Sequence, residues 1–229
     1  MAALPRLVPG EAISSQTAEI QHYTEVMAAA SLPRLTPEQY LKIEREADVK
    51  SEYINGEMFA MSGGTLPHAI LSSRLIGSLQ AKLDSGACTI VGSDLRVRVA
   101  VKGPFFYPDL TIYCGQPELA DDHRDTLLNP MVIFEVLSKS SEAYGRGLKF
   151  AHYRSIPSMR DYVLISQTEP RIEVFSRMPD GKWTLTEFVG LEVICQIPAV
   201  HAEIALRDIC RDISFDIALP DPPPLNPPA

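Results

Sequence analysis

The 229-residue sequence lacks the marks of several protein classes. It has no apolar run near the roughly 20 residues that a membrane-spanning helix needs. Its first ten residues contain two prolines and no apolar core of the kind that a secretory signal has. We therefore expect a cytoplasmic protein with no membrane segment.

Catalytic motifs of the common hydrolase types are absent too. The chain has no Gly-x-Ser-x-Gly elbow, no Gly-x-x-x-x-Gly-Lys phosphate loop and no His-Glu-x-x-His pair. Serine hydrolases, P-loop nucleotidases and zinc proteases that depend on these motifs are therefore disfavoured. Cysteine is also scarce, and none of the four forms a Cys-x-x-Cys pair or has a histidine at ligand spacing. We predict buried reduced thiols, not zinc ligands or disulfides, at Cys88, Cys114, Cys195 and Cys210.

Positive charge is in short supply, with 21 Lys and Arg against 29 Asp and Glu, a net charge of −8. Because duplex DNA carries about one negative charge per 1.7 Å, such a chain is a poor sequence-independent binder of nucleic acid. Residues 138–177, however, contain seven basic and four acidic residues. Arg96 and Arg98 also alternate with apolar residues along a predicted strand. We therefore predict weak, salt-sensitive binding to nucleic acid.

Proline composition marks the ends of the chain. Six of the 19 prolines fall between residues 220 and 229, which predicts an extended tail. Residues 1–33 carry no strong pattern beyond a short predicted helix at 18–30. We expect an N-terminal extension at 1–33, one globular domain at 34–214 and a proline-rich tail at 215–229.

The central residues alternate between helical and strand patterns. Thr36 to Gln39 forms a capping box that predicts a helix to about Ala47, and Asn55-Gly56 predicts a tight hairpin. An apolar stripe predicts a second helix at 66–83, and a third is expected at about 142–154. Short β-branched runs predict strands at 95–101, 108–113, 131–137, 162–165, 171–175 and 183–189. This order indicates an α/β fold with a mixed central sheet flanked by helices, preceded by a helix and a hairpin.

Two carboxylates stand in unusual places in this pattern. Glu135 shares a strand face with Ile133 and Leu137, where an ionised carboxylate is costly unless a cation or a donor meets it. Asp109 follows Pro108 at the start of a neighbouring strand, although aspartate is disfavoured inside strands. Taken singly, neither acid requires a functional role. Glu135 can be an edge-strand residue that reaches solvent or pairs with a structural arginine, and Asp109 can be a turn or strand-entry residue. Together with a backbone carbonyl, the two suit Mg²⁺, which assists phosphodiester cleavage.

These acids belong to a larger set of motifs that resembles a known family. Pro108-Asp109, Phe134 to Ser138, Lys149 and Tyr153 resemble the Uma2 family of restriction-endonuclease-like proteins, within the PD-(D/E)XK nuclease superfamily. The resemblance spans about residues 35–187, with further matching segments at 35–40, 54–57, 61–64 with His68, 93–97 and 156–162. It implies a restriction-endonuclease-like fold and an endonuclease that cuts DNA with Mg²⁺ or Mn²⁺.

The resemblance also implies roles for particular residues. Asp109 and Glu135 match the two metal-binding acids, with the Val136 carbonyl as a third ligand. The superfamily lysine two residues after the second acid is Leu137 here, so Lys149 is expected to replace it, and Lys139 is the competing candidate.

Further candidates are weaker. Glu57 matches an acid that adds a metal contact in the superfamily, and it fits a solvated hairpin residue equally well. His68 is a candidate for contact with a phosphate, for capping or for packing, and Tyr153 completes the set.

Two departures from the family pattern keep other functions open. Leu137 replaces the usual lysine, and Gly145 stands where relatives commonly have an aspartate. One alternative is a catalytically inactive nuclease-fold module that binds nucleic acid or a protein partner. Another is a metal-dependent hydrolase of a different phosphate ester. Because cutting both strands of a duplex needs two sites or two visits, we also expect a two-fold homodimer.

Overall fold

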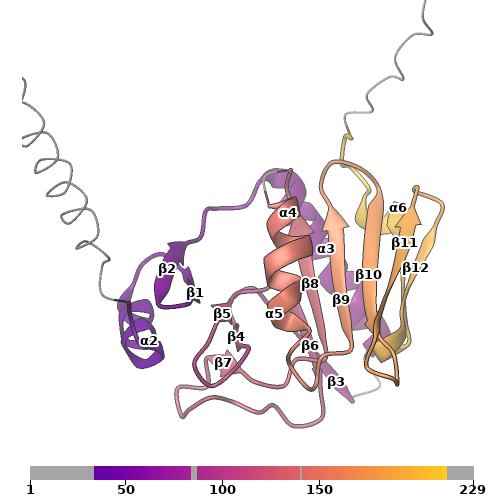
Figure 1. Ribbon diagram of the computed structural model, residues 1–229. Coiled ribbons are helices and arrows are strands. Elements are labelled where there is room, and N and C mark those ends of the chain that lie inside the picture. The colour runs from indigo at the N-terminus through magenta and orange to yellow at the C-terminus, as the bar shows by residue number, and fades with distance from the viewer. Residues whose placement is uncertain (1–33, 84–86, 140, 216–229) are drawn as a thin grey trace, which may run out of the picture.

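The computed structural model describes residues 34–83, 87–139 and 141–215. The helix predicted at 18–30 and the tail from 216 onward lie outside the described residues. Figure 1 shows two unequal sheets; the N-terminal hairpin belongs to the smaller one, and helix α2 (Pro37–Glu46) lies beside it. Within the described residues, no helix is long and apolar enough to cross a membrane.

The described chain begins with the predicted capped helix, α2 (Pro37–Glu46). Both hydrogen bonds of the capping box are present, since Thr36 Oγ1 accepts from the Gln39 N–H and Gln39 Oε1 accepts from the Thr36 N–H. The hairpin of β1 (Ser51–Ile54) and β2 (Glu57–Ala60) follows. Its turn residues Asn55 and Gly56 have φ angles of 51° and 92°, the positive values that a tight hairpin turn requires.

The smaller sheet has the strand order β2-β1-β5-β4-β7. Its other strands are β4 (Arg96–Arg98), β5 (Phe105–Phe106) and β7 (Thr126–Leu127). The strand predicted at 95–101 is thus only three residues long, because the chain turns at 99–104 to form β5. The alternation of Arg96 and Arg98 predicts a strand with one basic face, and this prediction is wrong, since Arg96 is 3% exposed and its guanidinium contacts Asp125.

Arg96 lies at the centre of a polar network that fixes α2 to the smaller sheet. Its guanidinium donates to Thr126 Oγ1 and to the Tyr107 hydroxyl, both at 3.2 Å, besides pairing with Asp125. The Tyr107 hydroxyl in turn donates to Glu44 Oε1 on α2 at 2.9 Å. Arg45, also on α2, reaches Asp125 at 2.8 Å. The helix is therefore tied to β4 and β7 by charge and hydrogen bonds.

The larger sheet is mixed, as predicted, with the strand order β11-β10-β9-β8-β6-β3. The central strand β8 (Val132–Leu137) runs parallel to β9 (Asp161–Ser166) and antiparallel to β6 (Leu110–Cys114). Strands β10 (Arg171–Arg177) and β11 (Trp183–Val189) extend one side, and β3 (Cys88–Gly92), which was not predicted, forms the other edge.

Helices cover both faces of this sheet (Figure 1). The long helix α3 (Leu66–Leu83) packs on one face through Leu71, Leu75, Leu79 and Leu83. The same core takes in the short elements β12 (Ile194–Ile197), η2 (Pro198–Val200), β13 (Ala202–Ala205) and α6 (Leu206–Ile209), none of them predicted. The opposite face carries one helical run made of α4 (Glu142–Tyr144), the π-helical turn η1 (Gly145–Lys149) and α5 (Phe150–Tyr153).

Strand β8 divides its side chains between these two cores. Val132, Phe134 and Val136 belong to the core under α3, whereas Ile133 and Leu137 belong to the core under α5. Glu135 therefore faces the helical run, on the strand face where the alternation predicts it.

The two departures from the family pattern meet at the start of that helical run. A Cβ added to Gly145 would lie 2.7 Å from Leu137 Cδ2, closer than a real Cβ can approach. Leu137 is 5% exposed and packs in the core. The glycine thus makes room for the leucine, and a larger residue at position 145 requires Leu137 to move.

The cysteines follow the prediction in part. Cys195 and Cys210 are free and buried, as expected. Cys88 and Cys114 instead form a disulfide, so the prediction of reduced thiols is wrong for this pair. The pairing of β3 with β6 places the two residues directly opposite each other, a register that a spacing of 26 residues does not reveal.

Candidate active site

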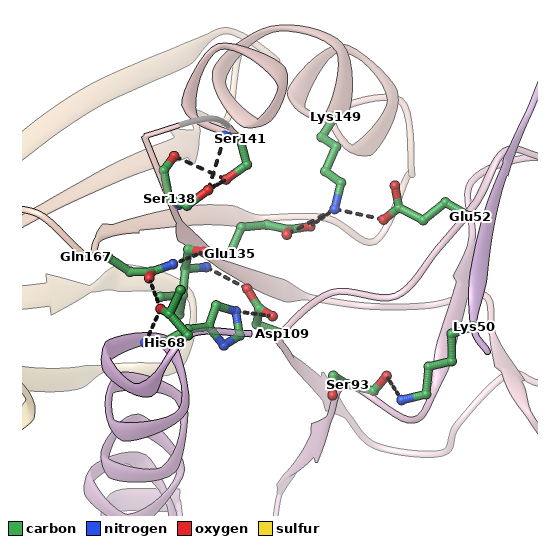
Figure 2. A network of polar contacts seen from close by, with 12 residues as sticks. Lys50, Glu52, His68, Ser93, Asp109, Glu135, Ser138, Ser141, Lys149 and Gln167 are labelled. Atoms are coloured by element: carbon green, nitrogen blue, oxygen red, sulfur yellow. Dashed lines mark hydrogen bonds and ion pairs between the residues drawn. The ribbon is translucent and has the colours of Figure 1, made fainter. Parts of the chain in front are cut away.

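A pocket of about 670 Å³ opens beside the second half of β8. Its walls come from the residue before β1, the loop between β2 and α3, the first turn of α3, the residue before β6 and the helical run on the other side. Most of the sequence-predicted site residues line it, namely His68, Asp109, Glu135, Val136 and Lys149. Figure 2 shows the side chains of His68, Asp109, Glu135 and Lys149 gathered at this place.

Asp109 is held on both carboxylate oxygens. Its Oδ2 accepts from the Val136 N–H at 2.7 Å, and its Oδ1 lies 2.9 Å from His68 Nε2 (Figure 2). The register pairs Leu110 with Phe134, so the residue before β6 falls beside the Glu135-Val136 step. The hydrogen bond to Asp109 holds the pKa of His68 above its ordinary value.

Glu135 is the buried acid that the strand alternation predicts. Both of its oxygens lie 3.1 Å from Lys149 Nζ, and Oε1 also accepts from the Tyr153 hydroxyl at 3.1 Å. Burial raises the pKa of Glu135 to about 7; the charges of Asp109 and Glu52 act in the same direction, and Lys149 opposes them. A carboxyl group with this pKa has a strong tendency to bind a cation or a proton.

Lys149 joins the two sheets electrostatically. Its Nζ lies 2.8 Å from Glu52 Oε1 on β1 as well as 3.1 Å from Glu135 on β8. Burial acts to lower the pKa of Lys149, but the two carboxylates outweigh it and hold that pKa above its ordinary value. The ammonium group is therefore charged, and η1 brings it directly over Glu135. A π-helical turn often marks a functional position, because it breaks the regular spacing of side chains.

Glu52 is the residue that sequence reasoning missed. It lies in a four-residue strand that is buried throughout, and its Oε2 accepts from the Tyr144 hydroxyl at 3.1 Å. The anomaly that pointed to Glu135, an acid among strand-forming apolar residues, was present here too. The predicted contribution of Glu57 is not supported: Glu57 is exposed on β2 and does not line the pocket.

Lys139 and Tyr153, the two remaining candidates from the sequence, do not line the pocket. Lys139 is exposed just after β8 and does not line the pocket, so Lys149 is the lysine that meets the acids. Tyr153 is completely buried, and its hydroxyl donates to Glu135.

The pocket residues fit a hard divalent cation by their chemistry. Asp109 and Glu135 line the pocket, and Glu52 lies next to it as the second partner of Lys149. Carboxylate and carbonyl oxygens are the ligands that Mg²⁺ and Mn²⁺ prefer, and Val136 can supply the carbonyl, which now receives a 3.4 Å contact from Gln167 Nε2. No group of three or more His, Cys, Asp or Glu among the described residues is already arranged to hold a metal.

Comparison with known proteins shows which family the chain resembles. The model of the Uma2 family, described as "Putative restriction endonuclease", matches residues 37–207. An uncharacterized protein of Synechocystis sp. is 33% identical over 189 residues, covering 82% of this chain and 97% of its own length. A second from the same organism is 34% identical over 165 residues, covering 72% and 93%.

A solved structure shares the fold. The crystal structure of a "putative nuclease" from Anabaena variabilis superposes with a TM-score of 0.60 at 16% identity, covering 76% of this chain and 97% of that one. The predicted fold class is confirmed.

Proposed function

This chain belongs to the Uma2 family of restriction-endonuclease-like proteins, and we propose that it is a metal-dependent endonuclease that hydrolyses DNA phosphodiester bonds. The observation that carries the proposal is the convergence of Asp109, Glu135 and Lys149 on one pocket. Asp109 directly precedes β6, Glu135 lies in β8, and Lys149 lies in η1 of the opposite helical run. We further propose that they act within a single domain at residues 34–214.

In this proposal, the Asp109 and Glu135 carboxylates and the Val136 carbonyl hold Mg²⁺ or Mn²⁺. The bound cation would supply Lewis acidity and lower the pKa of a water molecule. His68 and the Val136 N–H fix the orientation of Asp109. This anchoring keeps the carboxylate from rotating away from the pocket.

Lys149 takes the role that the superfamily gives to the lysine at the position of Leu137. Its charged ammonium lies beside Glu135, where it can orient an attacking water or stabilise the negative charge that develops on a phosphate. Glu52 positions the ammonium from the opposite side, and Tyr153 positions Glu135.

Purified protein is expected to nick supercoiled plasmid in Mg²⁺ or Mn²⁺ and to lose this activity, about 100-fold or more, when the cation is removed with a chelator. The measurement is the rate of conversion from supercoiled to open-circular DNA on a gel. Restoring the cation should restore the rate. A folded protein that neither nicks DNA nor binds Mn²⁺ in a calorimeter would instead be an inactive nuclease-fold module.

We also propose that the working form is a two-fold homodimer, since the described residues contain one such pocket per chain and a duplex has two strands to cut. Sedimentation at micromolar concentration should give a mass of about twice 25.3 kDa. A monomer that makes only single-strand nicks would contradict this part of the proposal alone.

A further inference from the structure

Resting on the proposed function, we infer that Lys50 is the residue of this pocket that binds a phosphate of the nucleic-acid substrate. Lys50 directly precedes β1 and lines the pocket. Its carbonyl accepts from the Met61 N–H at 2.8 Å, which fixes its backbone at the open end of the hairpin.

The pocket needs such a cation because its walls are acidic. A phosphodiester that approaches the carboxylates of Asp48, Asp109 and Glu135 meets negative charge. Lys149 acts at the reacting group in the proposed function, but its ammonium is bound to Glu52 and Glu135 and its side chain is only 10% exposed, so it is not free to bind a second phosphate. His68 is occupied in the same way by Asp109. Among the described residues that line the pocket, Lys50 is the remaining basic side chain.

The partners of Lys50 leave it available. Its Nζ donates to the Ser93 carbonyl at 3.1 Å and pairs with Asp94, whose side chain is 97% exposed. An ion pair with so exposed an acid contributes little and exchanges readily with solvent. The Lys50 side chain is itself 39% exposed, and its Nζ lies 5.4 Å from the centre of the Tyr107 ring. Figure 2 shows Lys50 and Ser93 set apart from the group around Lys149.

Two other basic residues, Arg146 and Arg160, are not placed to bind a phosphate at the pocket. Arg146 is paired with Glu142 and Glu173, each at 2.6 Å. The N–H of Arg160 donates to the Met131 carbonyl, so Arg160 lies at the start of β8, whereas the pocket lies beside its second half. Arg146 is thus held in structural pairs and Arg160 lies away from the pocket, whereas Lys50 lines it.

The test is DNA binding by the full chain carrying Glu135→Gln, which removes a proposed catalytic acid so that the DNA survives. Fluorescence anisotropy with a labelled duplex, over a series of salt concentrations, should show about tenfold weaker binding after Lys50→Gln. The slope of log affinity against log salt should become shallower by about 0.9, the loss of one phosphate contact. Lys50→Arg should retain most of the affinity.

Lys82→Gln is the matched control, since Lys82 is exposed in the last turn of α3, about 21 Å along the helix from His68 at 1.5 Å per residue. It should change neither the affinity nor the slope. Equal affinity and slope for Lys50→Gln and its parent would overturn the inference, and so would a parent that does not bind DNA. If the parent binds and responds as expected but the wild type never cuts, the inference stands and the proposed hydrolysis falls.

Discussion

Asp109→Asn and Glu135→Gln are each expected to slow plasmid nicking by about 10³-fold, because each removes a negatively charged ligand from the proposed metal site. The substitutions keep side-chain size and leave a carbonyl oxygen where the carboxylate stood. At position 109 the new amide oxygen can still accept from the Val136 N–H, which makes the shorter of the two contacts that fix Asp109. The loss should therefore appear in kcat and in Mn²⁺ affinity, without loss of the folded state.

Glu57→Gln is the matched control for this experiment. It removes one carboxylate from the same hairpin that carries Glu52, but at an exposed position outside the pocket. Its nicking rate should equal that of the wild type. Circular dichroism and thermal melting should show all three variants folded. Full activity in either pocket variant would remove that acid from the mechanism, whatever the family suggests.

Arg96→Ala is expected to lower the free energy of unfolding by about 3–5 kcal/mol, the range found when one partner of a buried ion pair is removed. The substitution leaves Asp125 without one of its two arginines and leaves the Tyr107 and Thr126 hydroxyls without a donor. Arg98→Ala on the same strand is the control, because Arg98 is only partly buried. Urea unfolding curves give the free energy of unfolding of each variant. Arg98→Ala should change it by less than about 1 kcal/mol.

The effect of Arg96→Ala should depend on pH in a defined direction. Burial acts to raise the pKa of Asp125, but hydrogen bonds from Arg45 and Arg96 outweigh it and hold that pKa below its ordinary value. A group with a depressed folded-state pKa stabilises the fold above its unfolded pKa of about 4, and this stabilisation fades as the pH falls below it. The wild type and Arg96→Ala should therefore converge in stability as the pH falls from about 4. A constant difference from neutral to acidic pH would show that packing, and not charge, accounts for the loss.

Much of the fold could be predicted because its signals are local. A capping box, an Asn-Gly turn and an apolar stripe each depend on neighbouring residues. Helices α2 and α3 match their predicted ends within about one residue, and the β1–β2 hairpin turns at Asn55-Gly56 as predicted. The strands that escaped prediction, β3, β5, β7 and the β12–β13 pair, are short. The partners of β3 and β7 lie far away in the sequence, and the β12–β13 pair is buried in the core under α3. The same limit explains the cross-strand cysteine pair.

The candidate site divides along similar lines. Glu135 and Asp109 could be found because an acid in a strand pattern is conspicuous within a few residues. Glu52 could not be assigned, since its meaning depends on Lys149, nearly one hundred positions later in the chain. Arg96 was misplaced for the same reason, because alternation along a strand cannot tell an exposed basic face from a buried arginine with an acid at position 125.

The ion pairs of Lys149 have a consequence for newly made protein. The lysine is held by Glu52 from the smaller sheet and by Glu135 from the larger one, so its position is defined only after both sheets have formed and docked. Glu52 leaves the ribosome 97 residues before Lys149 does. A nascent or partly folded chain therefore carries the reactive groups without their arrangement, and a cell that makes this protein meets any cutting activity only from finished molecules.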